Sequence, residues 1–334
     1  MNRLQRRLTI LRAKRNGCFD ANQHYLERAV RARCARRIRT LLRLGRPVVL
    51  ITPRWSRSDR FLDDIATDLQ VGEPQVTARV LSLMWLQGKG THDTWTWLVR
   101  AMSELCDVDL EGPVAQAVDR HGFRHVVAGL LRRVQGSGRR VLLMHGVQYL
   151  NLEARNDLIR VFEEHQAEFG ADLRFNLLMA SSVDGPTFEV ERAERFFLPD
   201  FGSDEAIEAL VEYLGPREQA DLERAAGVSG GVPSILHALG LHAEEHGELA
   251  GTNEAVWRVI GPLGHEIRDA SAILTSDDAL ASRLELLSSE GTVPRDDQVD
   301  PKLVRAGLVR DVLVGGHGRV ALRAPFFADL ADHG

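Results

Sequence analysis

The sequence predicts an α/β protein built on a parallel sheet, followed by a helical region and a C-terminal winged helix. Three observations carry this prediction. Short apolar runs alternate with helical patterns over residues 46–200, which is typical of a parallel sheet. The pattern is helical only from Asp204 onward. Near the end of the chain, helices precede Val309–Val314 and Val320–Arg323, which we interpret as a hairpin joined by Gly315–Gly318.

The individual elements follow from local patterns. An Arg-rich helix is expected at His24–Leu44, because apolar residues recur at helical spacing until Gly45, and Pro47 prevents its continuation. Short β-branched runs such as Val48–Ile51 are typical of buried parallel strands. The expected strands are 48–51, 75–83, 141–144, 175–180 and 196–198. The expected helices include 59–69, 94–105, 118–135, 153–168, 234–245, 278–289 and 301–306.

Composition excludes several classes of protein. The chain has 334 residues, of which 44% are hydrophobic and 27% charged, so it can bury cores in two or three domains. No apolar run approaches the roughly 20 residues of a membrane helix, and the N-terminus lacks the apolar run of a secretory signal. The cysteines Cys18, Cys34 and Cys106 are odd in number and far apart. We therefore expect a cytoplasmic protein with reduced thiols, no metal and no membrane partner.

Charge is distributed unevenly along the chain. The first 60 residues hold 17 of the 42 basic residues and 3 of the 47 acidic ones, which leaves 25 basic against 44 acidic residues in the remainder. A basic region on an acidic body favours an anionic partner, either nucleic acid or an acidic protein face. The alternative is that this region pairs with the chain's own acidic body. The candidate contact residues are Arg31, Arg33, Arg36, Arg37 and Arg39.

The strand, loop and helix at 48–69 stand where a phosphate-binding loop belongs. Such a loop reads G-x-x-x-x-G-K-[ST], with glycines that wrap the phosphates, a lysine that meets them and a hydroxyl that holds Mg²⁺. Here the loop begins Thr52-Pro53-Arg54, and the two glycines, the lysine and the hydroxyl residue are replaced by Thr52, Arg57, Ser58 and Asp59. The access of glycine to positive φ is lost, the lysine is missing and a carboxylate faces the phosphate position.

The second nucleotide motif is also altered. An apolar strand followed by two acidic residues normally supplies the carboxylate that binds Mg²⁺ and the residue that activates water. Val141–Met144 is followed instead by His145 and Gly146. The apolar pattern of the strand is preserved, whereas both acidic positions that follow it are changed. We therefore assign no catalytic residue and no cofactor, and treat these positions as remnants of a nucleotide site.

Several segments, in order, resemble the AAA-like members of the AAA+/STAND class of bacterial P-loop ATPases. The similar segments are Tyr25–Ala29, Val49–Arg54, Val141–Leu150, Phe175–Ser181, Phe196–Phe201, Gly230–Leu236, Leu286–Gly291, Ala306–Val309 and Pro325–Leu330. Gly230–Leu236 resembles the "GGxPxLL" segment of the family's helical lid, and Phe175–Ser181 its sensor-1 strand. The resemblance implies a P-loop NTPase-like parallel sheet, a helical lid and a winged helix. Any family role kept by Arg54 or Ser181 would be structural.

This resemblance divides the chain into four parts. They are a basic helical region (1–45), a degenerate P-loop α/β domain (46–202), a helical lid (203–265) and a winged-helix-like domain (266–334). Active members keep the Gly-Lys-Ser/Thr and the acidic pair, so the departures predict a pseudo-ATPase. We expect a scaffold, adaptor or regulatory subunit that binds another protein, such as an active ATPase or an effector, or a further copy of itself. Signalling, mobile-element and defence systems fit the family.

Two alternatives remain. The chain could regulate nucleic acid through its Arg-rich region and winged helix, although only Lys302 and Arg305 lie on the expected recognition helix and acidic residues surround the wing. It could also be an ATPase in which Arg54 or Arg57 replaces the lysine.

Two histidine pairs also stand out in the sequence. His242 and His246 match the H-x-x-E-H zinc motif, although a solvated helix end is the better interpretation. His121 and His125 are also four residues apart, which predicts surface positions near a helix start.

Overall fold

The computed structural model describes residues 29–72, 75–108, 119–134, 138–182, 190–260, 264–314 and 317–331. The described chain forms two compact units. Unit 1 comprises Ala32–Thr52 and Ser58–Leu198. Unit 2 comprises 29–31, Pro53–Arg57 and the residues from Pro199 onward. The first residues of the predicted Arg-rich helix, 24–28, lie outside the described residues.

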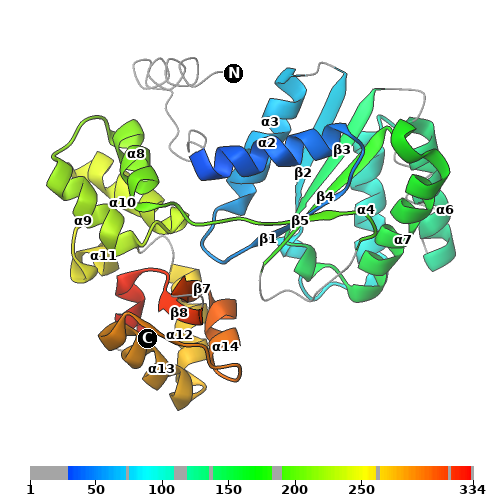
Figure 1. Ribbon diagram of the computed structural model, residues 1–334. Coiled ribbons are helices and arrows are strands. Elements are labelled where there is room, and N and C mark those ends of the chain that lie inside the picture. The colour runs from blue at the N-terminus through cyan, green and yellow to red at the C-terminus, as the bar shows by residue number, and fades with distance from the viewer. Residues whose placement is uncertain are drawn as a thin grey trace. The chain divides into compact units, whose positions relative to one another are not determined.

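Unit 1 contains the predicted parallel sheet. Its strand order is β2-β3-β4-β1-β5, and every neighbouring pair is parallel (Figure 1). All five predicted strands are present, but β5 begins two residues early and ends before Leu198, which donates its amide to the carbonyl of Ile51. The strands are β1 (Val48–Thr52), β2 (Val76–Ser82), β3 (Arg139–His145), β4 (Phe175–Ser182) and β5 (Glu194–Phe197).

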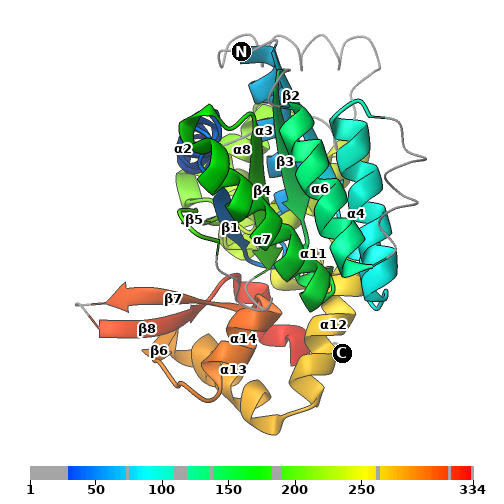
Figure 2. The same ribbon diagram turned by 90° about the vertical axis from the view of Figure 1, so that its right-hand side faces the viewer.

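Helices cover both faces of this sheet, as Figures 1 and 2 show. Alternate residues along each strand point to opposite faces. Val48 and Leu50 therefore pack in one buried cluster with α2 and α3, whereas Val49 packs in the other with α4, α6 and α7. The helices are α2 (Ala29–Arg43), α3 (Ser58–Gly72), α4 (Thr91–Leu105), α6 (Arg120–Val134) and α7 (Leu152–Phe169), with short 3₁₀ turns η1 (Met84–Leu86), η2 (Val147–Tyr149) and η3 (Gly170–Asp172).

Unit 2 is helical before it ends in a small antiparallel sheet. The sheet has the order β6-β8-β7, and β6 was not predicted because it has three residues. The predicted hairpin is present, but its second strand already begins at His317, so the joining loop is shorter than predicted. The elements are α8 (Ser203–Leu214), α9 (Gln219–Ser229), α10 (Pro233–His246), α11 (Asn253–Val259), α12 (Gly264–Thr275), α13 (Asp278–Glu290), β6 (Thr292–Pro294), α14 (Asp300–Ala306), β7 (Val309–Val314), β8 (His317–Leu322) and η5 (Pro325–Ala331). The assignment of this region as a winged helix stays a prediction.

The Gly-Gly-Val-Pro segment joins α9 to α10 within unit 2. Gly230 caps α9 in the left-handed conformation, with φ +58°, which favours glycine. A Cβ atom at this position would lie 1.8 Å from the carbonyl oxygen of Arg323, so the close approach of two backbones requires glycine. Pro233 follows at the first turn of α10, where its missing N–H costs no helical hydrogen bond. None of the described helices combines the length and apolar character needed to cross a membrane.

Candidate functional site

The carboxyl ends of β1, β3 and β4 lie side by side in unit 1. This edge of a parallel sheet is where open α/β proteins bind ligands. Thr52 ends β1, and its hydroxyl donates a hydrogen bond of 3.1 Å to the carbonyl of Ser181 on β4. His145 ends β3 and lies opposite Ala180 of β4. The structure thus brings Thr52, His145 and Ser181 together, as their strand positions predicted.

Ser58 and His145 close this edge with a direct contact. The Ser58 hydroxyl and His145 Nε2 form a hydrogen bond of 2.9 Å. Ser58 is the first residue of α3, so the helix start positions its side chain against the end of β3. Burial lowers the pKa of His145, and the negative charges of Asp59 and Asp63 oppose this shift. The pKa of Asp63 is itself raised, mainly by burial. The imidazole is therefore held towards its neutral form.

Gly146 follows His145 in a turn that leaves no room for a side chain. Its φ is +82°, and its amide donates to the carbonyl of Ala180 at 3.0 Å. A Cβ atom at this position would lie 2.9 Å from the ring of Tyr149. A glutamate at position 146 would therefore have to move the tyrosine and strain the backbone.

Gln148 is a member of this edge that the sequence analysis did not select. Its side-chain oxygen accepts hydrogen bonds from the Ser181 hydroxyl at 3.4 Å and the Ser182 amide at 3.2 Å. From η2, Gln148 therefore accepts the hydrogen bonds of two donors at the end of β4. Asp63 was also missed, although it lies four residues after Asp59 and so shares a helix face with it. This spacing of four residues is the signal in the sequence that could have identified Asp63.

The segment Pro53–Arg57 belongs to unit 2. Trp55 is buried there, its ring centroid 5.4 Å from that of Phe327, and its carbonyl accepts from the Ser234 amide at 3.0 Å. The prediction that positive φ is lost with the glycines was wrong. Trp55 and Arg57 adopt φ of +68° and +50°, which non-glycine residues reach only at a cost of about 1 kcal/mol each. Tertiary contacts of this segment overcome that cost.

Arg323 donates to four acceptor atoms within unit 2. Its guanidinium makes a bidentate pair with Asp200, at 2.9 and 2.6 Å, and Nη1 donates to the carbonyls of Arg54 and Gly307, both at 2.8 Å. The side chains of Arg323 and Asp200 are only 2% and 8% exposed. Arg54 itself lies 3.9 Å from Asp269. The backbone carbonyl of Arg54 is thus bound by a side chain of the same chain.

The Arg-rich helix is largely occupied by contacts within the chain. Arg31 is buried, donates to the carbonyls of Ser56 and Pro199, and lies over the ring of Phe201. Arg37 pairs with Glu194, and Arg39 pairs with Asp68. Arg33 and Arg36 are exposed and form no ion pair within the described part of the chain. Pairing of the basic region with the chain's own acidic residues thus holds for Arg37 and Arg39, whereas Arg31 is bound by backbone carbonyls.

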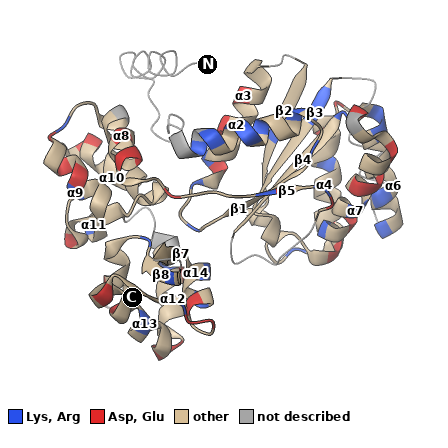
Figure 3. Cartoon of the chain, viewed as in Figure 1, with Lys and Arg blue, Asp and Glu red and all other residues tan. Residues whose placement is uncertain are grey.

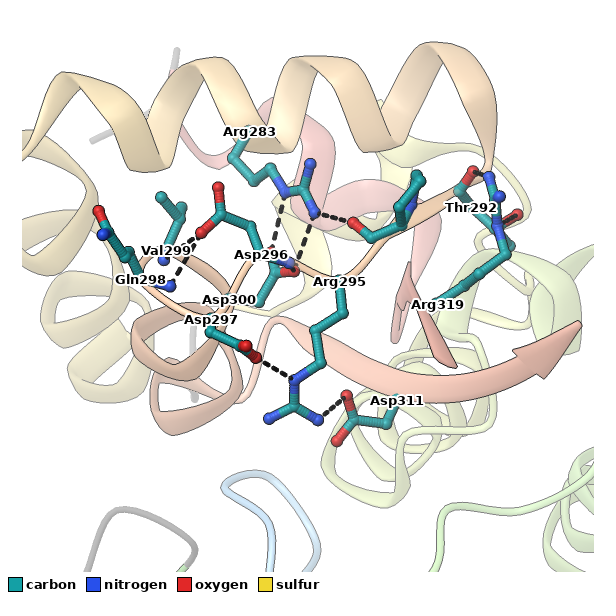
Figure 4. A network of polar contacts seen from close by, with 11 residues as sticks. Arg283, Thr292, Arg295, Asp296, Asp297, Gln298, Val299, Asp300, Asp311 and Arg319 are labelled. Carbon is teal, nitrogen blue, oxygen red and sulfur yellow. Dashed lines mark hydrogen bonds and ion pairs between the residues drawn. The ribbon is translucent and has the colours of Figure 1, made fainter. Parts of the chain in front are cut away.

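Several basic residues in and around the C-terminal sheet are likewise engaged, whereas Arg305 and Arg310 are exposed and form no ion pair among the described residues. Figure 4 shows Arg295 between Asp297 and Asp311, at 3.3 and 2.9 Å, and Arg283 bidentate on the buried Asp300, at 2.9 Å to each oxygen. Arg319 donates to Thr292, and Lys302 pairs with Asp277 at 2.6 Å. These carboxylates compete with any phosphate for the same cations, which disfavours a nucleic-acid surface here.

The H-x-x-E-H motif offers no metal centre among the described residues. The rings of His242 and His246 lie 4.4 Å apart on α10. The described residues contain no group of three or more His, Cys, Asp or Glu placed to hold a metal ion.

No protein-family model and no curated protein matches this sequence. Solved structures do match it. The Walker-type ATPase PABY2304 of Pyrococcus abyssi superimposes with a TM-score of 0.66 at 10% identity, over 90% of this chain and 95% of that chain. The RuvB Holliday junction branch migration motor of Thermotoga maritima gives 0.47 at 14% identity over 90% and 96% of the two chains. A STAND protein with a tetratricopeptide repeat sensor, PH0952 of Pyrococcus horikoshii, gives 0.43 at 10% identity over 89% and 41%.

The assignment of the fold rests on the match to the P. abyssi structure. The chain has the fold of P-loop ATPases of the Walker type, as the AAA+/STAND resemblance predicted. An identity of 10% concerns the arrangement of the backbone, and the chemistry must be argued from the residues at the edge of the sheet.

Proposed function

We propose that this protein is an AAA+/STAND-type member of the P-loop fold that does not hydrolyse ATP and acts by binding another protein. The observation that carries the proposal is the contact between Ser58 and His145, at 2.9 Å. It occupies the position of the lysine that would meet the phosphates and the position of the carboxylate that would bind magnesium. A buried imidazole whose pKa is lowered supplies neither the negative charge that magnesium needs nor a carboxylate base.

The remaining positions support the same conclusion. Asp59 places a carboxylate in the first turn of α3, where a phosphate would otherwise meet the helix N-terminus. Gly146 stands in a turn whose space is taken by Tyr149. Without hydrolysis, the fold would serve as a scaffold, adaptor or regulatory subunit in the cytoplasm. The expected partner is an active ATPase, an effector or another copy of the chain, in a signalling, mobile-element or defence system.

Calorimetric titration of ATP and ADP with Mg²⁺ into the purified chain tests the proposal. We expect no heat of binding at millimolar nucleotide and no release of phosphate. A variant that restores two of the lost groups, Ser58→Lys with His145→Asp, should also fail to hydrolyse ATP, because Arg57, Asp59 and Gly146 would remain. Magnesium-dependent hydrolysis by the unaltered chain, abolished by Arg57→Ala, would overturn the proposal in favour of a non-standard ATPase.

Self-assembly of the chain is measured separately from nucleotide binding. Light scattering coupled to size-exclusion chromatography gives the mass of the particle across a range of protein concentrations. A mass that is a multiple of 37.2 kDa would favour assembly with further copies of the chain. A constant mass of one chain would direct the search to a different protein as the partner.

A further inference from the structure

A charged hollow lies between α6 and α7 of unit 1, and nothing in the proposed function uses it. Its volume is about 600 Å³, within the range of small-molecule sites. The two helices lie side by side in Figures 1 and 2. Seven residues line the hollow: Arg120, His121, Arg124, His125, Arg160, Val161 and Glu164. The pair His121 and His125, which the sequence places near a helix start, thus lies at the hollow.

Helical spacing explains why these residues converge. Residues four apart share a helix face, so Arg120 and Arg124 align on α6, and Arg160 and Glu164 align on α7. The apolar residues of the opposite faces, such as Phe123 and Phe162, pack in the core and fix both helices. The hollow is therefore built on two rigid elements.

The charges at the hollow are unbalanced. Arg120 Nε donates to the buried Asp157 at 2.7 Å. Arg124 and Arg160 donate to the same oxygen of Glu164, at 2.8 and 3.1 Å. Three guanidinium groups thus face two carboxylates. Figure 3 shows the basic and acidic residues that α6 and α7 carry.

The donors at the hollow are also incompletely used. One carboxylate oxygen serves two guanidinium groups, although each can present five N–H donors. The buried Nε of Arg124 has no hydrogen-bond partner among the described residues.

We propose that this hollow binds the phosphoryl group of a small soluble molecule. A phosphoryl group brings a charge of about −1.5 to −2 and three acceptor oxygens, which suits two guanidinium forks that share one acceptor. A single carboxylate would repeat the contact that Glu164 already makes. The volume leaves space for the remainder of the molecule.

Sodium pyrophosphate, titrated calorimetrically at low salt, is the probe. The double variant Arg124→Gln with Arg160→Gln should bind it roughly 10- to 100-fold more weakly, because two charge-assisted hydrogen bonds are lost. The matched control is Arg132→Gln, an exposed arginine of α6 that pairs with Glu168 outside the hollow. The control should bind as the unaltered chain does. Glu164→Gln should bind at least about threefold more tightly, because it removes the competing charge.

Three results would overturn the inference. They are no binding by the unaltered chain, an equal loss in the Arg132→Gln control, or equal binding of citrate, which carries carboxylates only. Circular dichroism of each variant shows whether it is folded. The result is independent of the proposed function, since Ser58 and His145 are unchanged in every variant. If titration of ATP releases heat and the double variant abolishes it, the nucleotide binds in this hollow. If the double variant keeps that heat, the nucleotide binds elsewhere, which would count against the proposed function.

Discussion

Two polar regions of this protein differ in how their charges are satisfied. Arg323 is buried in unit 2, and its donors end on Asp200 and on two backbone carbonyls. The arginines of the α6–α7 hollow are partly exposed, and two of them share one oxygen of Glu164. In the first region, which we call the closed region, acceptors of the chain itself bind the donors of Arg323. The second region has donors left for a ligand.

This difference separates groups that stabilise the fold from groups that can bind. A buried charge must be paired, because the desolvation cost of an unpaired ion is several kcal/mol. An exposed arginine keeps its water and contributes little to stability. Removing a side chain from the closed region should therefore unfold the protein more readily, whereas removing Arg124 or Arg160 from the hollow should change binding alone.

The largest effect is expected for Arg323→Met. The substitution leaves Asp200 buried without its partner and leaves the carbonyls of Arg54 and Gly307 without their donor. Loss of one member of a buried pair costs about 3–5 kcal/mol. Urea unfolding followed by circular dichroism measures the change in the free energy of unfolding.

The double variant Arg323→Met with Asp200→Leu is the control for that prediction. Replacing both charges by apolar groups removes the unpaired ion, so the double variant should be more stable than Arg323→Met alone. If the single variant were as stable as the unaltered chain, Arg323 would not belong to the closed region.

A second, smaller effect concerns pH and the edge of the sheet in unit 1. The pKa of His145 in the folded protein is lowered by burial, so the unfolded chain binds a proton more readily. Its stabilising contribution is complete above the ordinary histidine pKa of about 6.5 and is lost as the pH falls below that value. His145→Asn should therefore lose less stability than the unaltered chain between about pH 7.5 and 5.5, the range that brackets this pKa.

The buried His165 does not obscure this comparison. Its pKa is also lowered, mainly by burial, but it is present in both proteins, so the difference between them reports on His145. Unfolding in urea at each pH provides the measurement. Equal losses in the two proteins would place the His145 imidazole in water and would contradict its burial at the edge of the sheet.

The central strands of the sheet were predictable because they are largely apolar on both faces. Val48–Leu50, Val141–Met144 and Phe175–Ala180 are continuous buried runs, and helices separate them in the sequence. The three-residue β6 was missed because pairing with β8, and not its own pattern, makes it a strand. The start of β8 was misplaced because His317 and Gly318 are exposed and polar, which in sequence is typical of a turn.

The candidate site was only partly predictable. Strand ends identified Thr52, His145 and Ser181, because parallel strands end at one edge of a sheet. The Ser58–His145 contact and the burial of Trp55 depend on tertiary packing, which sequence spacing does not encode. Arg31 was predicted to contact a partner, because a sequence pattern does not reveal that carbonyls distant in the chain surround it. The hollow could not be predicted from the sequence, because it forms only where α6 packs beside α7.

The smallest effect on stability is expected for the hollow. Arg124 pairs with Glu164 on the surface, where the carboxylate is 57% exposed, and such pairs contribute about 0–1 kcal/mol. Arg124→Gln should therefore lower the free energy of unfolding by less than about 0.5 kcal/mol, because Arg160 still holds Glu164. Urea unfolding beside the Arg323→Met variant measures this. A loss of several kcal/mol would place Arg124 with the closed region, and its effect on pyrophosphate would then reflect unfolding.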